Sequence, residues 1–401
     1  MPLIGGLFLL LACAHALGRL CERLRQPALA GHLLAGVALG PSLLGWFAPS
    51  GAAGVAFGAL ADLALLFVVS TAGLEMRLRG VLDAFRGRGA AALSIGFILP
   101  ALAGAAAAAL FAIRGAPLLA IALCASITAL PVALQILGAF GLMQSRIAQA
   151  AIAGALLADI VAFIILGMTM AWTHDGQVHG FAVEALLALA RLGGFIAAIA
   201  VVYWLSRAFP QRDDAERQTA AANIAITAAC IVGLGALSEI LGFHFAIGAF
   251  FAAMMITPEL IGARAFERLK EACETLTAAV FAPLFLAYQG VQFELQDLAH
   301  PAFTLTLLAA AAGGKLLGGY ATGRLLRMSA HEAWGVGIVM NARGVMGLAA
   351  ANIAFRSGLI DESIYSALLA MALVTTILTP LLLQRWRLVG DSARTSQTAQ
   401  V

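Results

Sequence analysis

Charged residues are scarce in this chain. Asp, Glu, Lys and Arg together make up only 11% of the 401 residues, whereas 62% of the residues are hydrophobic. A soluble protein of this length carries about twice that charged share. The scarcity of charge therefore excludes a soluble globular protein and predicts an all-α polytopic membrane protein.

Recognisable cysteine, nucleotide and enzyme motifs are missing as well. The five cysteines form neither a CxxC pair nor a Cys/His metal spacing, so we interpret them as packing residues. Neither GxGxxG nor a Walker A sequence occurs, and no GxSxG or HExxH pattern supports an intramembrane enzyme. We therefore expect no enzyme activity, no cofactor and no nucleic-acid partner.

Long apolar segments are what the chain has instead. A helix needs about 20 mostly apolar residues to cross a bilayer. The hydropathy pattern predicts about 13 spans. They lie at 3–18, 27–45, 54–74, 89–113, 116–138, 147–172, 182–205, 219–241, 243–257, 274–290, 302–323, 332–356 and 363–383.

Positive charge is distributed unevenly between the loops. Most of the 24 lysines and arginines follow the first, third and other odd-numbered spans, whereas the opposite loops hold only Arg114 and Arg356. Loops rich in Lys and Arg remain in the cytoplasm. We therefore expect an N-terminus outside the cell, a short cytoplasmic tail at 384–401, and a place in a prokaryotic inner (plasma) membrane.

An odd number of spans also suggests an internal repeat. Six helices, a linker helix at 182–205 and six more helices would form two halves of opposite orientation, the inverted-repeat plan of many secondary transporters. The plan pairs 116–138 with 332–356, and both segments have polar, helix-interrupting centres: Thr128 with Pro131 in one, and Asn341 to Gly344 in the other. Two broken helices in matching positions predict a substrate site.

One acid, Asp159, lies near the middle of the apolar segment 147–172. A charge at the bilayer centre costs roughly 2.5–3.5 kcal/mol, so such residues are kept where they contact a partner, an ion or a proton. Asp159 can hold a proton or a metal cation, but not both at once. The alternative is a buried aspartate that pairs with a neighbouring helix.

Hydroxyl groups in 116–138 are candidate ligands for Na⁺ or K⁺. Pro131 has no N–H and cannot bond the carbonyl of Ile127, and carbonyls freed near Ser126 and Thr128 would add oxygen ligands. The alternative is a simple proline kink with hydroxyls bonded back to their own helix.

Two cations lie at similar depth. Lys315, between glycine pairs that allow close backbone approach, is interpreted as the counter-charge of Asp159 when no cation is bound, with purely structural pairing as the alternative. Arg343 is expected to donate to orphan carbonyls where a helix is broken. Asn341, two residues earlier, is grouped with it as support of the break.

Several segments resemble the monovalent cation:proton antiporters, specifically their Kef-like second branch and its sodium/hydrogen exchanger membrane domain. The resemblance runs from about residue 25 to 382. It is carried by Gln26-Pro27, residues 35–45, residues 66–75, residues 246–250, Lys315, Arg343-Gly344 and Thr379-Pro380. Ala158 departs from the family pattern, which usually has Asp, Asn or Gln before the key aspartate.

The resemblance implies a single exchanger domain over 1–383 that forms a homodimer. Scaffold helices would lie at 1–74 and 219–290, and a moving core at 89–172 and 302–383. The two broken helices would cross, and Asp159 would match the ion-carrying aspartate.

We therefore expect a secondary antiporter that exchanges Na⁺ or K⁺ for H⁺ by alternating access of Asp159 and serves pH homeostasis. The alternatives are a sodium-coupled carrier of an organic anion, which needs a second sodium site and an anion pocket, or a membrane sensor or scaffold that has lost transport.

Overall fold

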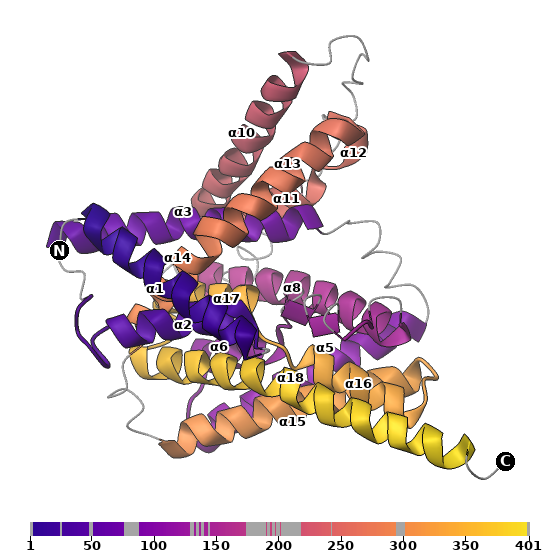
Figure 1. Ribbon diagram of the computed structural model, residues 1–401. Coiled ribbons are helices and arrows are strands. Elements are labelled where there is room, and N and C mark those ends of the chain that lie inside the picture. The colour runs from indigo at the N-terminus through magenta and orange to yellow at the C-terminus, as the bar shows by residue number, and fades with distance from the viewer. Residues whose placement is uncertain are drawn as a thin grey trace. The chain divides into compact units, whose positions relative to one another are not determined.

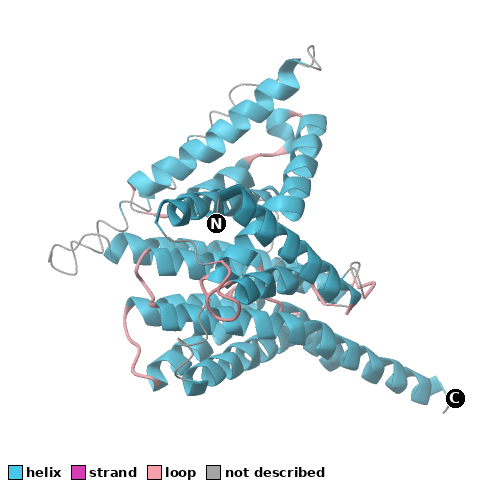
Figure 2. Ribbon diagram, turned by 60° about the vertical axis from the view of Figure 1, so that its left-hand side comes forward, coloured by secondary structure: helices cyan, strands magenta, loops and turns pink. Residues whose placement is uncertain are grey.

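The computed structural model describes residues 3–24, 26–47, 51–75, 88–128, 145–173, 218–241, 243–293 and 301–398, with short pieces between 132 and 142 and isolated positions between 190 and 201. Every regular element in this part of the chain is a helix (Figure 1, Figure 2). The polytopic all-helical class predicted from composition is confirmed.

Most of the expected spans are helical where the chain is described, although the helix in 27–45 already ends at Leu39. Six described helices are long and apolar enough to cross a membrane: α1 (Leu3–Arg23), α3 (Gly51–Glu75), α5 (Arg88–Leu110), α8 (Arg146–Thr173), α15 (Pro301–Leu325) and α18 (Glu362–Thr398). Shorter apolar helices occupy other expected spans: α2 (Ala28–Leu39), α6 (Ala116–Ser126), α10 (Gln218–Ile240) and α11 (Phe245–Met255). The pair α16 (Ala330–Met340) and α17 (Val345–Arg356) would make a seventh long span.

The linker helix expected at 182–205 lies almost entirely outside the described residues, as does Pro131. The total of about 13 spans and the inverted repeat therefore stay predictions. Two boundaries differ from expectation. Helix α18 continues to Thr398 through most of the segment expected to be a tail, and the charged loop before 274 is helical, as α12 (Pro258–Ile261) and α13 (Ala263–Leu276).

The chain divides into two compact units. The first comprises Met1–Ala48, Asp83–Ala162 and Leu286–Val401. Within it α1 packs on α2, α5 packs on α6, and α15 packs on α5, α16 and α18. The approach of α15 to α5 is close because Gly314 lies opposite Pro100: a Cβ atom on Gly314 would lie 2.7 Å from the Cα atom of Pro100. The close backbone approach expected around Lys315 is thus confirmed.

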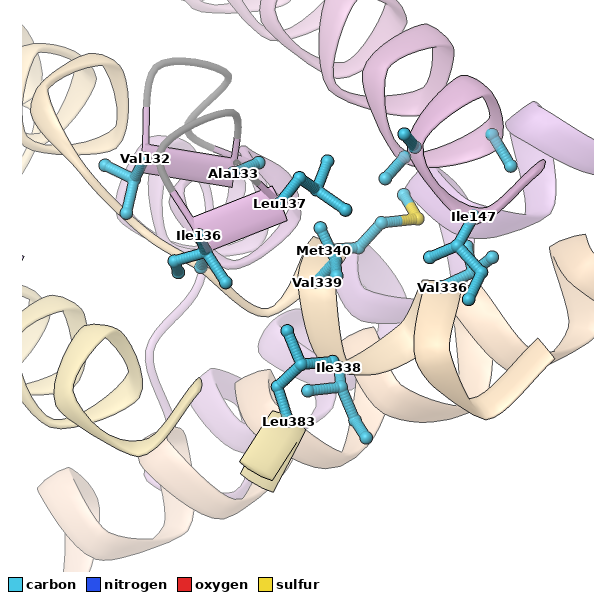
Figure 3. Packing of buried hydrophobic residues seen from close by; sticks show 14 of the residues in the cluster. Val132, Ala133, Ile136, Leu137, Ile147, Val336, Ile338, Val339, Met340 and Leu383 are labelled. Atoms are coloured by element: carbon cyan, nitrogen blue, oxygen red, sulfur yellow. The ribbon is translucent and has the colours of Figure 1, made fainter. Parts of the chain in front are cut away.

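A buried apolar cluster in this unit supports the end of α16. Its members come from residues 132–151, from α16 and the flanking Met328 and Ala342, and from Leu383 of α18, and they pack around Met340, the last residue of α16 (Figure 3). The side chain of Met340 also contacts α8, because a Cβ atom on Gly154 would lie 2.8 Å from its Cε atom. The C-terminal end of α16 is thus packed between α8, α18 and residues 132–151.

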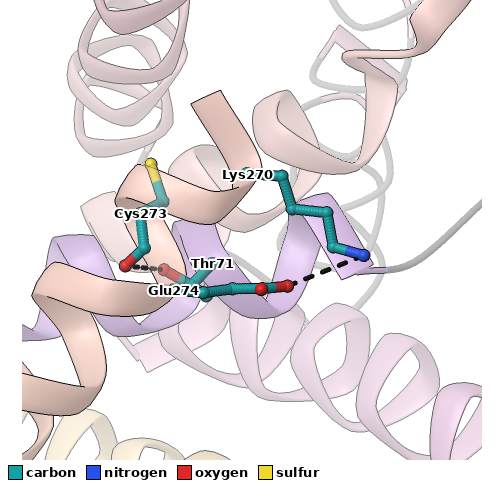
Figure 4. Close-up of polar contacts among 4 residues, drawn as sticks. All are labelled: Thr71, Lys270, Cys273 and Glu274. Carbon is teal, nitrogen blue, oxygen red and sulfur yellow. Dashed lines mark hydrogen bonds and ion pairs between the residues drawn. The ribbon is translucent and has the colours of Figure 1, made fainter. Parts of the chain in front are cut away.

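The second unit comprises Pro49–Leu82 and Phe163–Phe285. In it α3 packs on α11 and on η1, a π-helical turn (Thr277–Phe281) between α13 and α14 (Ala282–Val291). The hydroxyl of Thr71 in α3 lies 2.7 Å from that of Thr277 and 3.5 Å from the carbonyl oxygen of Cys273. Figure 4 shows the contact between Thr71 and Cys273 beside the half-exposed Lys270–Glu274 ion pair. The winding therefore changes from α-helical in α13 to π-helical in η1 at the point where Thr71 of α3 contacts the chain.

Candidate functional site

Helix α6 ends in the middle of an expected span. Ile127, the next residue, has φ −66° and ψ 140°, which is extended backbone. A helix end leaves its last four carbonyl groups without partners in the helix. The first of these, on Leu123, still accepts a hydrogen bond of 3.1 Å from the N–H of Ile127. Because Ser126 and Thr128 are completely buried, the other three carbonyls need donors from the protein.

Two buried cations supply those donors. The guanidinium of Arg343 donates to the carbonyl oxygens of Cys124 and, at 2.6 Å, of Ala125. The ammonium of Lys315 donates to the carbonyl oxygen of Ser126. Arg343 is 2% exposed and Lys315 is 0% exposed. Positive charge at a helix C-terminus opposes the negative end of the helix dipole, so both cations stabilise the broken end of α6.

The second broken helix contacts the first at its own interruption. Helix α16 ends at Met340, α17 begins at Val345, and the two are bent by 46°. The carbonyl oxygen of Met340 accepts a hydrogen bond of 3.1 Å from the hydroxyl of Thr128. The carbonyl oxygen of Arg343 accepts one of 2.5 Å from the hydroxyl of Thr376 in α18. The expected interruptions are therefore present in both segments and are hydrogen-bonded to each other.

The two candidate hydroxyls are already engaged within the protein. The hydroxyl of Thr128 accepts a hydrogen bond of 2.7 Å from the ammonium of Lys315 while it donates to Met340. The hydroxyl of Ser126 donates to the carbonyl oxygens of Ala122 and Leu123, at 3.1 and 2.8 Å. The geometry at Ser126 is thus the back-bonded arrangement named as the alternative to cation ligation.

Asp159 differs from these residues because its carboxylate has no donor. The residue lies in α8 with 0% exposure, and neither of its oxygens has a hydrogen-bond partner among the described residues. The charge of Lys315 acts on it, but the hydrogen bonds of that ammonium go to Ser126 and Thr128. A buried charge without donors is costly, so this carboxylate can gain from a proton or a cation.

Asn341 is the second polar side chain with no partner at the break. It is 0% exposed, and neither its amide oxygen nor its amide nitrogen has a hydrogen-bond partner in the described part of the chain. Its backbone is satisfied, since its N–H donates to the carbonyl oxygen of Ile338 at 3.2 Å. The unsatisfied groups are therefore confined to the side chain.

The structure thus brings most of the predicted site residues into one hydrogen-bonded network of Ser126, Thr128, Lys315 and Arg343. Asp159 and Asn341 stand outside its hydrogen bonds. Sequence reasoning missed Thr376, which anchors the break through the carbonyl of Arg343. The available signal was a pair of adjacent threonines, Thr375 and Thr376, in an apolar segment.

Comparison with known proteins decides the family. The family model described as "Sodium/hydrogen exchanger, transmembrane" matches residues 8–386, nearly the whole chain. The chain belongs to this exchanger family. The resemblance to the monovalent cation:proton antiporters is thereby confirmed, and family membership places the protein in a membrane.

Several curated relatives are about a quarter identical to this chain over the aligned residues. A Na⁺/H⁺ antiporter of Enterococcus hirae is 24% identical over 385 residues, which cover 96% of this chain and 98% of that protein. The Na⁺/H⁺-K⁺ antiporter GerN of Bacillus cereus is 27% identical over 383 residues, 94% of each. Cation/H⁺ antiporter 20 of Arabidopsis thaliana is 26% identical over 92% of this chain. The chain spans 47% of that protein, about half its length.

Solved structures show the same exchanger fold. The chain matches two structures of the sodium proton antiporter MjNhaP1 from Methanocaldococcus jannaschii, with TM-scores of 0.68 and 0.65 at 16% identity. The alignments cover 96% and 95% of this chain and 95% of each MjNhaP1 chain. The polytopic helical antiporter fold expected from the sequence is confirmed.

Proposed function

We propose that this exchanger-family protein is a secondary antiporter that exchanges Na⁺ or K⁺ for H⁺, with Asp159 as the residue that binds either ion. One observation carries the proposal: a completely buried carboxylate has no hydrogen-bond donor for either oxygen among the residues that the structure describes. It lies in the compact unit that holds two interrupted helices and two buried cations. The names of the relatives from Enterococcus hirae and Bacillus cereus, Na⁺/H⁺ antiporter and Na⁺/H⁺-K⁺ antiporter, support the substrate class.

Charge balance explains why the two ions exclude each other. Arg343 and Lys315 are held at the C-terminal end of α6 by hydrogen bonds to its carbonyls. A proton on Asp159 removes its negative charge, and a bound Na⁺ or K⁺ neutralises it. When neither ion is present, the positive charge of Lys315 offsets part of the desolvation cost of the carboxylate. One carboxylate therefore passes through three states and never holds both ions.

Exchange also requires that Asp159 be exposed to each side of the membrane in turn. We assign this alternating access to a core of 89–172 and 302–383 that moves against scaffold helices at 1–74 and 219–290, joined by the linker at 182–205. The protein would act as a homodimer in a prokaryotic inner membrane, with its N-terminus outside and its C-terminus in the cytoplasm. Its task there would be pH and cation homeostasis, with no enzyme activity and no cofactor.

Purified protein in proteoliposomes tests the proposal directly. A pH gradient is imposed, and Na⁺, K⁺ and Li⁺ are added in turn while the internal pH is followed. We expect Na⁺ or K⁺ to dissipate the gradient, and Asp159→Asn to abolish this effect while folding and dimerisation stay normal, since the amide cannot cycle a proton. Loss of the gradient with no cation, or cation-dependent proton movement by Asp159→Asn, would contradict the proposed site. If the wild-type protein shows no cation-dependent proton movement, the membrane sensor or the organic-anion carrier is favoured instead.

A further inference from the structure

We infer that Asn341 is a direct ligand of the transported cation, and that its amide oxygen completes the site formed by Asp159. The inference rests on the proposed antiport function. It goes beyond the structural support of the broken helix that the sequence indicates for this residue.

The first reason is the state of the side chain. A buried amide that lacks partners for both its oxygen and its nitrogen destabilises the folded protein, because each group has lost its hydrogen bonds to water without replacement. Such groups are rare in native proteins and each needs an explanation. Asn341 is 0% exposed, and both of its side-chain polar atoms lack partners among the described residues. A residue that only stabilised the break would use those atoms in hydrogen bonds to neighbouring backbone groups. The hydroxyl of Thr376 does this when it donates to the carbonyl oxygen of Arg343.

The second reason is its position. The residue before it, Met340, accepts a hydrogen bond from Thr128, which in turn accepts one from Lys315, the lysine whose charge acts on Asp159. The Met340 side chain contacts Gly154 of α8. Asp159 follows Gly154 on that helix by five residues, about 7.5 Å along its axis. The interruption that carries Asn341 is thus packed against the helix that carries Asp159.

The third reason is the shortage of ligands on α8. Between Gln149 and Thr169 the only polar side chain of this helix is Asp159, which follows the apolar Ala158. A dehydrated monovalent cation needs several oxygen ligands to replace its water. The hydroxyls of Ser126 and Thr128 are engaged in hydrogen bonds within the protein. An uncharged oxygen from Asn341 supplies a ligand and leaves Asp159 as the single group that titrates.

The test is the cation KM of Asn341→Ala and of Asn341→Leu, the second of which keeps the volume without an oxygen. The matched control is Asn352→Ala in α17. Asn352 is also a buried asparagine of the same broken span, but its amide donates to Gln289 at 3.0 Å. We expect the Asn341 variants to raise KM for Na⁺ or K⁺ about tenfold, which corresponds to about 1.4 kcal/mol. Asn352→Ala should lower the melting temperature and leave KM unchanged.

A second measurement separates a ligand from a structural support. Na⁺ or K⁺ should raise the melting temperature of the wild type and of Asn352→Ala, but raise that of the Asn341 variants much less. Asn341→Asp keeps an oxygen but adds a second carboxylate, so it should retain cation binding that Asn341→Leu loses, with an altered pH dependence. An unchanged KM and an unchanged cation-dependent shift in Asn341→Leu would overturn the inference, as would loss of folded protein in both the Ala and Leu variants. Such results would leave antiport through Asp159 intact if the wild type exchanges and Asp159→Asn does not.

Discussion

At the scale of single residues, Lys315 combines two tasks. Its ammonium is completely buried and donates to the Ser126 carbonyl and the Thr128 hydroxyl, and its charge acts on Asp159. It therefore closes the end of α6 and favours the charged form of Asp159, the carboxylate proposed to bind the ions. A change at this one position should affect both stability and proton coupling.

Lys315→Met should lower stability and move the pH–activity profile to higher pH. Removing one member of a buried charged network costs roughly 3–5 kcal/mol. A carboxylate that has lost a neighbouring positive charge also holds its proton more tightly. Thermal unfolding and exchange rates across the pH range measure the two effects. Lys270→Met is the control, since its 3.6 Å pair with Glu274 is half-exposed to solvent and should contribute little to stability. A variant with the wild-type profile and melting temperature would show that Lys315 does not act at the site.

Individual residues also show what sequence alone can and cannot predict. Asp159 stands out because an isolated acid in an apolar segment has no polar neighbour in that segment that would explain its presence structurally. Thr376 does not, because its hydroxyl also donates to the carbonyl of Ala372 one turn back, as threonines in membrane helices commonly do. The hydrogen bond between Lys315 and Thr128 joins residues 187 positions apart. Local pattern indicates which groups need partners, but only the fold decides which partners they receive.

At the scale of elements, the C-terminal end of α6 depends on Arg343. We expect Arg343→Ala to leave the carbonyls of Cys124 and Ala125 without donors, at a cost of roughly 1–3 kcal/mol each. Arg146→Ala is a matched control, because Arg146 donates to the Leu326 carbonyl after α15 at 2.9 Å but is exposed. Its loss should change stability by less than about 0.5 kcal/mol. Equal melting temperatures for the two variants would show that the buried carbonyls find other donors.

The interruptions themselves were predictable, whereas other features of the helices were not. Asn341 to Gly344 marked a break because glycine and polar residues interrupt an otherwise apolar pattern. No local sequence pattern predicted the π-helical turn at Thr277–Phe281. Local sequence also did not predict the buried network that joins α17, α18 and α14. In this network Asn352 and Tyr365 both donate hydrogen bonds to Gln289. These features depend on contacts between segments far apart in the chain.

At the scale of the whole molecule, composition and hydropathy predicted the helical membrane class, and family membership and fold follow from motifs spread over nearly the full chain. The division into compact units did not follow from hydropathy, since every span is apolar in a similar way. Helices α1 and α2 belong to the same unit as α15 to α18. Packing choices among apolar helices depend on small-residue contacts such as Gly314 on Pro100.

The proposed sharing of one carboxylate by proton and cation predicts how exchange depends on pH. If Asp159 binds either ion, protons compete with the cation, so the apparent KM for Na⁺ or K⁺ should rise as pH falls. Each pH unit below the pKa of the site should raise KM by up to about tenfold, while the maximal rate at saturating cation changes far less. The reasoning depends on Ala158, which cannot share the proton as a second acid would. Exchange rates in proteoliposomes over a range of cation concentrations, from about pH 6 to about pH 9, measure this dependence around neutrality. A constant KM across that range, with activity still lost in Asp159→Asn, would mean that proton and cation occupy separate sites.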